Sequence, residues 1–299
     1  MKHNWLFLLI ILFPFYSCNK EEQPKDNVVP AAVFSDFNRR YPSSEGYEMT
    51  SSICIDDGTS RIIFKDNKDF QYTAVYCGEE WYLTQKEYDK SSFLNQLPKN
   101  IADSYIKLGI KDSRYIDENH FVLETSRKGG APTQFDFHFS ADRIADNQYY
   151  NNLDHHIVLD EDGNLITVDY GYYENFSWWR NIDSSIKYLI DNYPQAYILR
   201  VVHYEGVSVF FISDNGINRR ITVGFYDDWE WEETLTILDI DTVLPDYVLE
   251  EYIKYHSEHP ELPEYSAVYY RCMAGKPDCY LLRMGTESKN TTLVVPVRK

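Results

Sequence analysis

The chain has 299 residues, of which 43% are hydrophobic and 16% aromatic, enough for two ordinary domains that each bury a core. Its formal net charge of -18 argues against a nucleic-acid partner, because phosphates would be repelled. The many Tyr, Phe and Trp residues favour strands over long polar helices.

Residues 1–17 are typical of a lipoprotein signal peptide. A basic start precedes the apolar run WLFLLIILFPF, which is too short to span a bilayer, and Ser17 then precedes Cys18. A small residue directly before a cysteine resembles a bacterial lipobox, so Cys18 is the expected lipid-attachment site. An ordinary secretory signal or an uncleaved anchor is the alternative interpretation.

Residues 18–30 are polar and charged, as a flexible tether should be. Within them, Lys20-Glu21-Glu22 resembles the surface-export signal of Bacteroidetes lipoproteins. The N-terminal sequence therefore predicts a cell-envelope protein of the outer membrane, exposed at the surface if this export signal acts. The lipid anchor is its expected contact with the membrane.

The first half of the chain is echoed in the second. Three motifs match in order: helices ending in Tyr-Pro at Pro42 and Pro194, Trp-x-x-Thr from Trp81 and Trp231, and Leu-Pro helices from Leu97 and Leu244. The apolar residues of the helical segments recur at the spacing of one helix face. The pattern indicates a tandem duplication, with one domain at 31–175 and a second at 176–299.

Each predicted domain divides again into two units. After every helix the apolar period changes to two, as in TQFDFHFS and RITVGFYD, and turn sequences separate the strands. The turn DEDGN at Asp160 also has oxygen ligands for calcium, but the strand alternation after it favours a hairpin. The predicted fold class is α+β, with tandem repeats of one helix packed on an antiparallel sheet of three or four strands. Such a helix leaves the other sheet face free for solvent or a partner.

The order of four motifs resembles one known family. The motifs are Tyr41-Pro42, Trp81 to Thr84, Leu97-Pro98 and Asp160 to Gly163, and their order is similar to that of the PepSY-like, beta-lactamase-inhibitor-like lipoproteins of Bacteroidetes. The resemblance covers most of residues 31–170 and, more loosely, 182–299. It implies exported, non-enzymatic domains with a fold like the beta-lactamase inhibitory protein. No inhibitory contact residues carry over onto this chain.

Four cysteines remain once Cys18 is assigned to the lipid, an even number in an oxidising compartment. Local pairing predicts the disulfides Cys54–Cys77 and Cys272–Cys279, with free buried thiols as the alternative for the first pair. We expect no metal site and no cofactor, because no C-x-x-C pair or histidine cluster offers a ligand set.

The segment YDDWEWEE, residues 226–233, is the richest in chemical groups. Alternation places Asp228, Glu230 and Glu232 on one strand face and Trp229 and Trp231 on the other. Paired carboxylates beside tryptophans also occur in glycosidases, but core on one face and solvent on the other explains the pattern. Trp178 and Trp179 lie at the junction between the copies, where we expect them to join the domains. These four tryptophans are nevertheless the candidate ligand-binding residues.

No nucleophile, zinc-protease, dinucleotide or P-loop signature is present, so we expect no enzymatic activity. The sequence predicts a monomeric, non-catalytic envelope module that binds a protein partner, with inhibition of a hydrolase as one form of that activity. The alternative is a surface lipoprotein that binds glycans.

Overall fold

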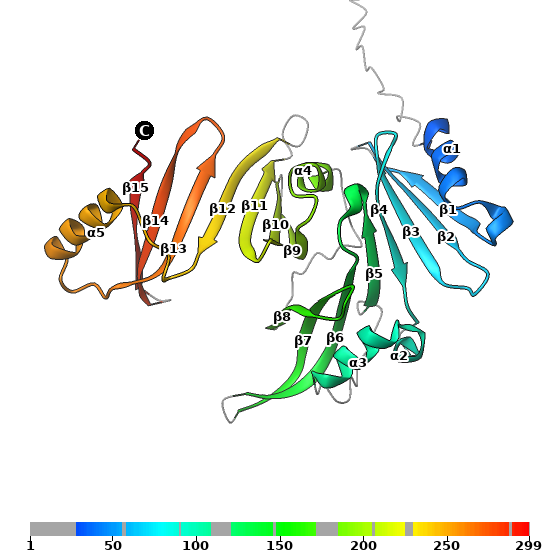
Figure 1. Ribbon diagram of the computed structural model, residues 1–299, viewed down its shortest axis with the longest axis horizontal. Coiled ribbons are helices and arrows are strands. Elements are labelled where there is room, and N and C mark those ends of the chain that lie inside the picture. The colour runs from blue at the N-terminus through cyan, green and yellow to red at the C-terminus, as the bar shows by residue number, and fades with distance from the viewer. Residues whose placement is uncertain are drawn as a thin grey trace, which may run out of the picture.

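The computed structural model describes residues 28–55, 58–89, 91–108, 121–145, 148–171, 185–204, 207–224, 230–286 and 289–298. In these ranges the backbone is mostly β-stranded and forms two antiparallel sheets, a first sheet of eight strands and a second sheet of seven (Figure 1). The predicted signal peptide, most of the tether and the predicted domain boundary at 175 and 176 lie outside the described residues.

Both sheets keep their strands in chain order. The first contains β1 (Glu48–Cys54), β2 (Thr59–Lys65), β3 (Gln71–Cys77), β4 (Glu80–Glu87), β5 (Phe121–Arg127), β6 (Gln134–Ala145), β7 (Gln148–Asp160) and β8 (Leu165–Gly171). The second contains β9 (Tyr197–Tyr204), β10 (Val207–Asp214), β11 (Ile217–Gly224), β12 (Trp231–Leu238), β13 (Tyr265–Met273), β14 (Lys276–Thr286) and β15 (Lys289–Pro296). The helices in the described part are α1 (Ala31–Arg40), α2 (Phe93–Gln96), α3 (Lys99–Lys107), α4 (Ser185–Asn192), α5 (Asp246–Glu258) and the 3-10 turns Ser43–Glu45 and Lys128–Gly130.

The sheets are larger than the predicted three- to four-stranded units. β4 pairs with β5 through Leu83 and Arg127, and β12 pairs with β13 through Thr234 and Cys272, so neighbouring units merge into one sheet. Pairing satisfies backbone groups that separate small sheets would leave on their edges. The expectation of separate small sheets was therefore wrong, and the fold is predominantly β.

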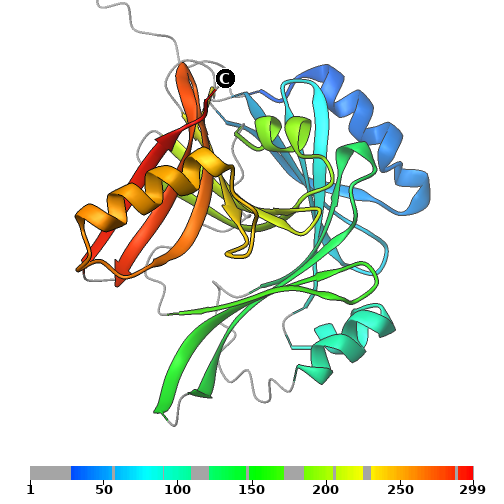
Figure 2. The ribbon, with the colours of Figure 1, turned by 60° about the vertical axis from the view of Figure 1, so that its left-hand side comes forward.

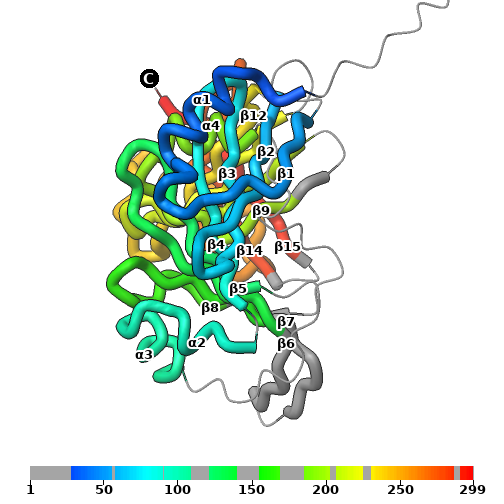
Figure 3. Tube along the Cα trace, turned by 90° about the vertical axis from the view of Figure 1, so that its right-hand side faces the viewer, coloured from blue at the N-terminus to red at the C-terminus, as the bar shows by residue number. Residues whose placement is uncertain are grey.

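Helices α1 and α3 lie on the same face of the first sheet. α1 packs with Phe64 and Tyr72, whereas α3 packs with Phe135. The register carries one row across the sheet from Phe64 through Tyr72, Lys86 and Glu124 to Phe135, so both helices contact one face. Figure 3 views the first sheet from the side of α1, with α3 below it.

Helix α4 lies between the two sheets. Its buried Ile186 and Leu189 share a core with Val75 and Leu83 of the first sheet and with strands of the second. Val75 and Leu83 lie on the sheet face opposite α1, because side chains alternate along β3 and β4. Part of the face that sequence alone left free for a partner is therefore covered by the second half of the chain (Figures 1 and 2).

A buried glutamine also joins the two sheets. Gln134, on β6, donates a 2.7 Å hydrogen bond from Nε2 to the carbonyl of Ile198 on β9 and accepts a 3.0 Å bond at Oε1 from the Ile198 N–H. Its amide thus occupies the place that a neighbouring strand would take at the edge of β9. The same Nε2 donates to Asp136 at 2.8 Å.

Proline and turn residues define several element ends as the sequence indicated. Pro98 and Pro245 lie immediately before α3 and α5, and their carbonyls accept the first hydrogen bonds of these helices. Asp160 Oδ1 accepts hydrogen bonds from the Asp162 and Asn164 N–H groups, which confirms the hairpin turn. Gly163 has φ +85°, and an added Cβ would lie 3.0 Å from the Asn100 carbonyl of α3. This position therefore requires glycine.

The structure contradicts both predicted disulfides. Cys54, Cys77, Cys272 and Cys279 are free thiols. Cys54 packs with the α1 core and Cys77 with the α4 core, on opposite faces of the first sheet and with β2 between their strands. Cys279 pairs directly with Arg271, the residue beside Cys272, so the second pair is offset by one position and also faces opposite sides.

Candidate functional site

Trp231 belongs to the core side of the second sheet. It is half-buried against the α4 core, and its Nε1 donates a 2.9 Å hydrogen bond to Thr234 Oγ1. Trp81 makes the same 2.9 Å bond to Thr84 Oγ1 in the first sheet. Indole burial and a side-chain partner explain the Trp-x-x-Thr motif as a packing element.

The other sequence candidates lie outside the described residues. These are Cys18, Trp178, Trp179, Trp229 and, among the acids, Asp228. The described acids of the predicted row are Glu230 and Glu232, and both are exposed. Glu230 precedes Trp231, the first residue of β12, and Glu232 follows it. No paired-carboxylate site is formed by the described members of this row.

The acid that the sequence did not single out is Glu233. It is buried and accepts hydrogen bonds from Arg220 Nη2 at 2.5 Å and Arg271 Nε at 2.6 Å. Burial would raise the pKa of the Glu233 carboxyl, but the hydrogen bonds and charges of the two arginines outweigh it and lower the pKa below 4.5. Both arginine side chains stay partly exposed, at 40% and 33%. Arg220 and Arg271 lie far from Glu233 in the sequence, so no local sequence pattern predicts this cluster.

The cluster lies on the second sheet's face opposite α4 and α5, which we call the open face. α5 covers the other face through Val248, Val268, Leu282 and Val295 (Figure 2). On the open face, one cross-strand row of apolar side chains runs over β12–β15, and its members are Ile237, Tyr269, Leu281 and Val294. Ile237 is 43% exposed and Val294 54%, so this row is in contact with solvent.

Arginines lie on both sides of the apolar row. Arg271 pairs with Leu235 and Cys279 in the row on one side, and Arg283 pairs with Ala267 and Thr292 in the row on the other. Arg283 makes no ion pair with another described residue. The open face can therefore offer apolar contact and charge-assisted hydrogen bonds at the same time.

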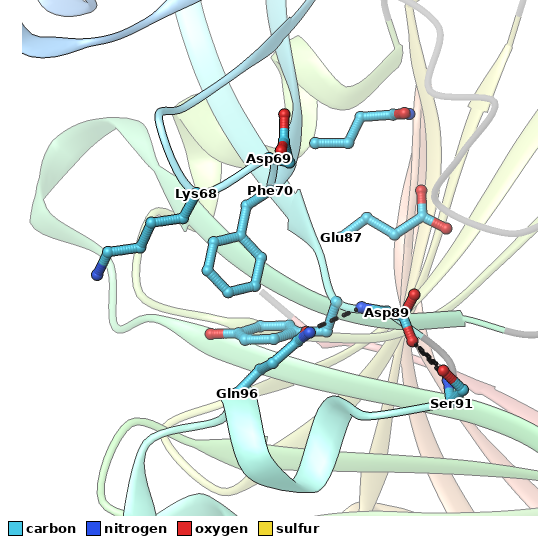
Figure 4. Close-up of a pocket in the computed structure, with 9 residues that line it drawn as sticks. Lys68, Asp69, Phe70, Glu87, Asp89, Ser91 and Gln96 are labelled. Carbon is cyan, nitrogen blue, oxygen red and sulfur yellow. Dashed lines mark hydrogen bonds between the residues drawn. The ribbon is translucent and has the colours of Figure 1, made fainter.

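A hollow of about 540 Å³ lies where β3 begins and β4 ends (Figure 4). Phe70 and Tyr88 line it with rings 5.6 Å apart, and the Lys86 ammonium lies 4.1 Å from the centre of the Phe70 ring. Tyr88 is buried, and the Gln96 amide accepts a hydrogen bond from the Asp89 N–H. The turn between β4 and α2 uses these groups for its own structure, so we place the candidate site on the open face.

The described residues contain no group of three or more His, Cys, Asp or Glu side chains arranged to hold a metal ion. No helix in the described part of the chain is long and apolar enough to cross a membrane. The two adjacent histidines of β7 are buried on opposite faces, with His155 stacked on Phe139 and His156 3.3 Å from Asp136.

Comparison with known proteins gave structural neighbours alone. No family model matches the chain, and no curated protein matches it. A BLIP-like protein of Bacteroides fragilis is similar at 11% identity and a TM-score of 0.36, covering 52% of this chain and 96% of its own. A DUF2874 family protein of Bacteroides ovatus is similar at 15% identity and a TM-score of 0.34, covering 48% of this chain and 88% of its own. A DUF2874 family protein of Bacteroides uniformis is similar at 13% identity and a TM-score of 0.32, covering 48% of this chain and 90% of its own.

Proposed function

We propose that this protein is a non-catalytic binding module of the cell envelope, anchored through Cys18, that presents its open face to a protein partner. The observation that carries the proposal is the solvent-exposed apolar row from Ile237 to Val294. Apolar side chains that are exposed in the free protein become more stable when a partner removes them from water. An exposed apolar row is therefore typical of an interaction surface. The envelope address rests on the N-terminal sequence.

Repeated packing supports a tandem architecture as part of this proposal. In each half, a Trp-x-x-Thr pair stabilises the strand that leads into the second unit, with identical indole-to-hydroxyl distances. Each half also has a helix that is followed directly by Tyr-Pro and packs on the sheet of that half, α1 in the first and α4 in the second. We place the two PepSY-like domains at 31–175 and 176–299, with the binding surface in the second.

A protein partner fits the open face better than a glycan. Sugar-binding surfaces use exposed aromatic rings, whereas the large hydrophobic side chains that are exposed in the described ranges are all aliphatic. Tyr269 is half-buried within the row. Aliphatic rows of this kind suit the apolar centre of a protein interface, surrounded by a polar rim.

Site-specific photo-crosslinking tests the proposal. A photoreactive phenylalanine analogue at Val294 should give a discrete protein adduct in intact cells, and Leu281→Asp in the same chain should abolish it. The matched control is the analogue at Met49, which is 47% exposed on β1 of the first sheet. An adduct that forms equally at Met49, or that survives Leu281→Asp, would contradict the proposal.

A further inference from the structure

Among its described strand residues, the open face has a charge opposite to that of the chain. The formal net charge of the whole sequence is -18. On the open face, the register places more cations than carboxylates among the described strand residues: Arg200, Arg220, Arg271, Lys276 and Arg283, against Glu233 and, at the end of β12, Glu232. A local reversal of this kind attracts partners that the rest of the surface repels.

The arginines on one side of the apolar row, Arg220 and Arg271, are held in place. Glu233 lies between Arg220 and Arg271 and fixes both guanidinium groups through hydrogen bonds, while both arginine side chains stay partly exposed. Fixing a guanidinium in the free protein lowers the entropy lost when it binds a carboxylate. Arg283, on the other side of the row, has no described carboxylate partner of its own.

We infer that the occupant of the open face is an acidic protein segment whose apolar side chains lie on the row of Ile237, Tyr269, Leu281 and Val294 while its carboxylates bind Arg271 and Arg283. This inference rests on the proposed function and adds the chemistry of the partner. The row crosses four strands and is therefore about 14 Å long, the length of a helix of roughly nine residues or of a short strand.

The size of the cationic patch favours a segment over a membrane. Charges are screened beyond about 8–10 Å at physiological ionic strength, so a narrow segment on the row interacts mainly with the local arginines. An anionic bilayer extends beyond the whole molecule and would also meet its acidic surfaces. A lipid surface is therefore the alternative outcome of the test.

The test is selection of a displayed library of random twelve-residue peptides on the purified mature chain. We expect the enriched peptides to combine apolar residues with two or more Asp or Glu, and their synthetic forms to lose binding in Leu281→Asp. Arg283→Glu should weaken binding tenfold or more. The matched control is Arg298→Glu, which makes the same charge change beside α5, where Arg298 pairs with Glu251.

Three results would overturn the inference, and they can be told apart. The selected peptides could lack acidic residues, with binding that is lost in Leu281→Asp but unchanged in Arg283→Glu. This result would support the binding surface and contradict its preference for acidic segments. Peptides that do not depend on Leu281, or none at all, would count against the binding surface itself. Binding to vesicles with 30% phosphatidylglycerol that is lost in Arg283→Glu would assign the cations to a lipid surface instead.

Discussion

The joint between the two sheets allows a sharp test, because one side chain replaces a strand there. Gln134→Met keeps the length of the side chain and removes its amide. The Ile198 N–H, the Ile198 carbonyl and Asp136 Oδ1 each lose a buried partner. A buried polar group left without a partner costs about 1–3 kcal/mol, so we expect the free energy of unfolding to fall by about 4 kcal/mol. That is a large share of the stability of an ordinary domain.

The first sheet offers a matched control. Gln85 lies on β4 in the same cross-strand row as Gln134, separated from it by Thr125, and it is also buried. Its Nε2 has no hydrogen-bond partner in the described part of the chain. Gln85→Met therefore removes an unsatisfied amide, and we expect a change of less than about 1 kcal/mol in either direction.

Urea unfolding followed by tryptophan fluorescence measures both variants, and amide hydrogen exchange reports on Ile198 directly. Gln134→Met should speed exchange of the Ile198 N–H relative to its neighbours on β9, whereas Gln85→Met should leave it unchanged. Equal destabilisation by the two substitutions, or unchanged exchange at Ile198, would refute the view that the Gln134 amide holds the edge of β9.

Three further predictions concern the core, the ion cluster and the anchor. Trp231→Ala should lower the free energy of unfolding by about 2–3 kcal/mol, because a half-buried indole and its hydrogen bond to Thr234 are lost, whereas an unchanged melting curve would remove Trp231 from the core. Glu233→Gln should lower the free energy of unfolding by about 2 kcal/mol at pH 7. Because the folded-state pKa of Glu233 is lowered, its contribution to stability is present above pH 4.5 and is lost as the pH falls through that lowered pKa. The free energies of unfolding of the two proteins, measured in urea, should therefore converge in acid, and a difference that stays constant with pH would contradict the assignment. Cys18→Ser should release the protein from the membrane fraction, and retention of the variant on the membrane with its signal segment removed would exclude the lipid anchor.

Local features were predictable from the sequence because neighbouring residues decide them. The helix-face spacing at Phe34, Phe37 and Tyr41 is confirmed by their packing in one core around α1. The predicted strand TQFDFHFS lies in β6 from Gln134 onward, and the turn at Asp160 forms through hydrogen bonds within five residues. Period, turn chemistry and proline position all act over a few residues, so one sequence suffices to detect them.

The tertiary structure alone decided which sheet face is available. Val75 and Cys77 of β3 lie on the face opposite α1, and it is the packing of Leu189 and its neighbours that shows α4 covering this face. The open face depends likewise on strand register. Glu233 contacts Arg220 and Arg271 because β12 pairs with β11 and β13 in one particular register. A shift of that register by one residue would move each side chain to the other face of the sheet. The predicted disulfides failed for the same reason, since closeness of Cys272 and Cys279 along the chain does not place their side chains on one face. Register and layer order are set by contacts between distant segments, and these contacts leave no local pattern in a single sequence.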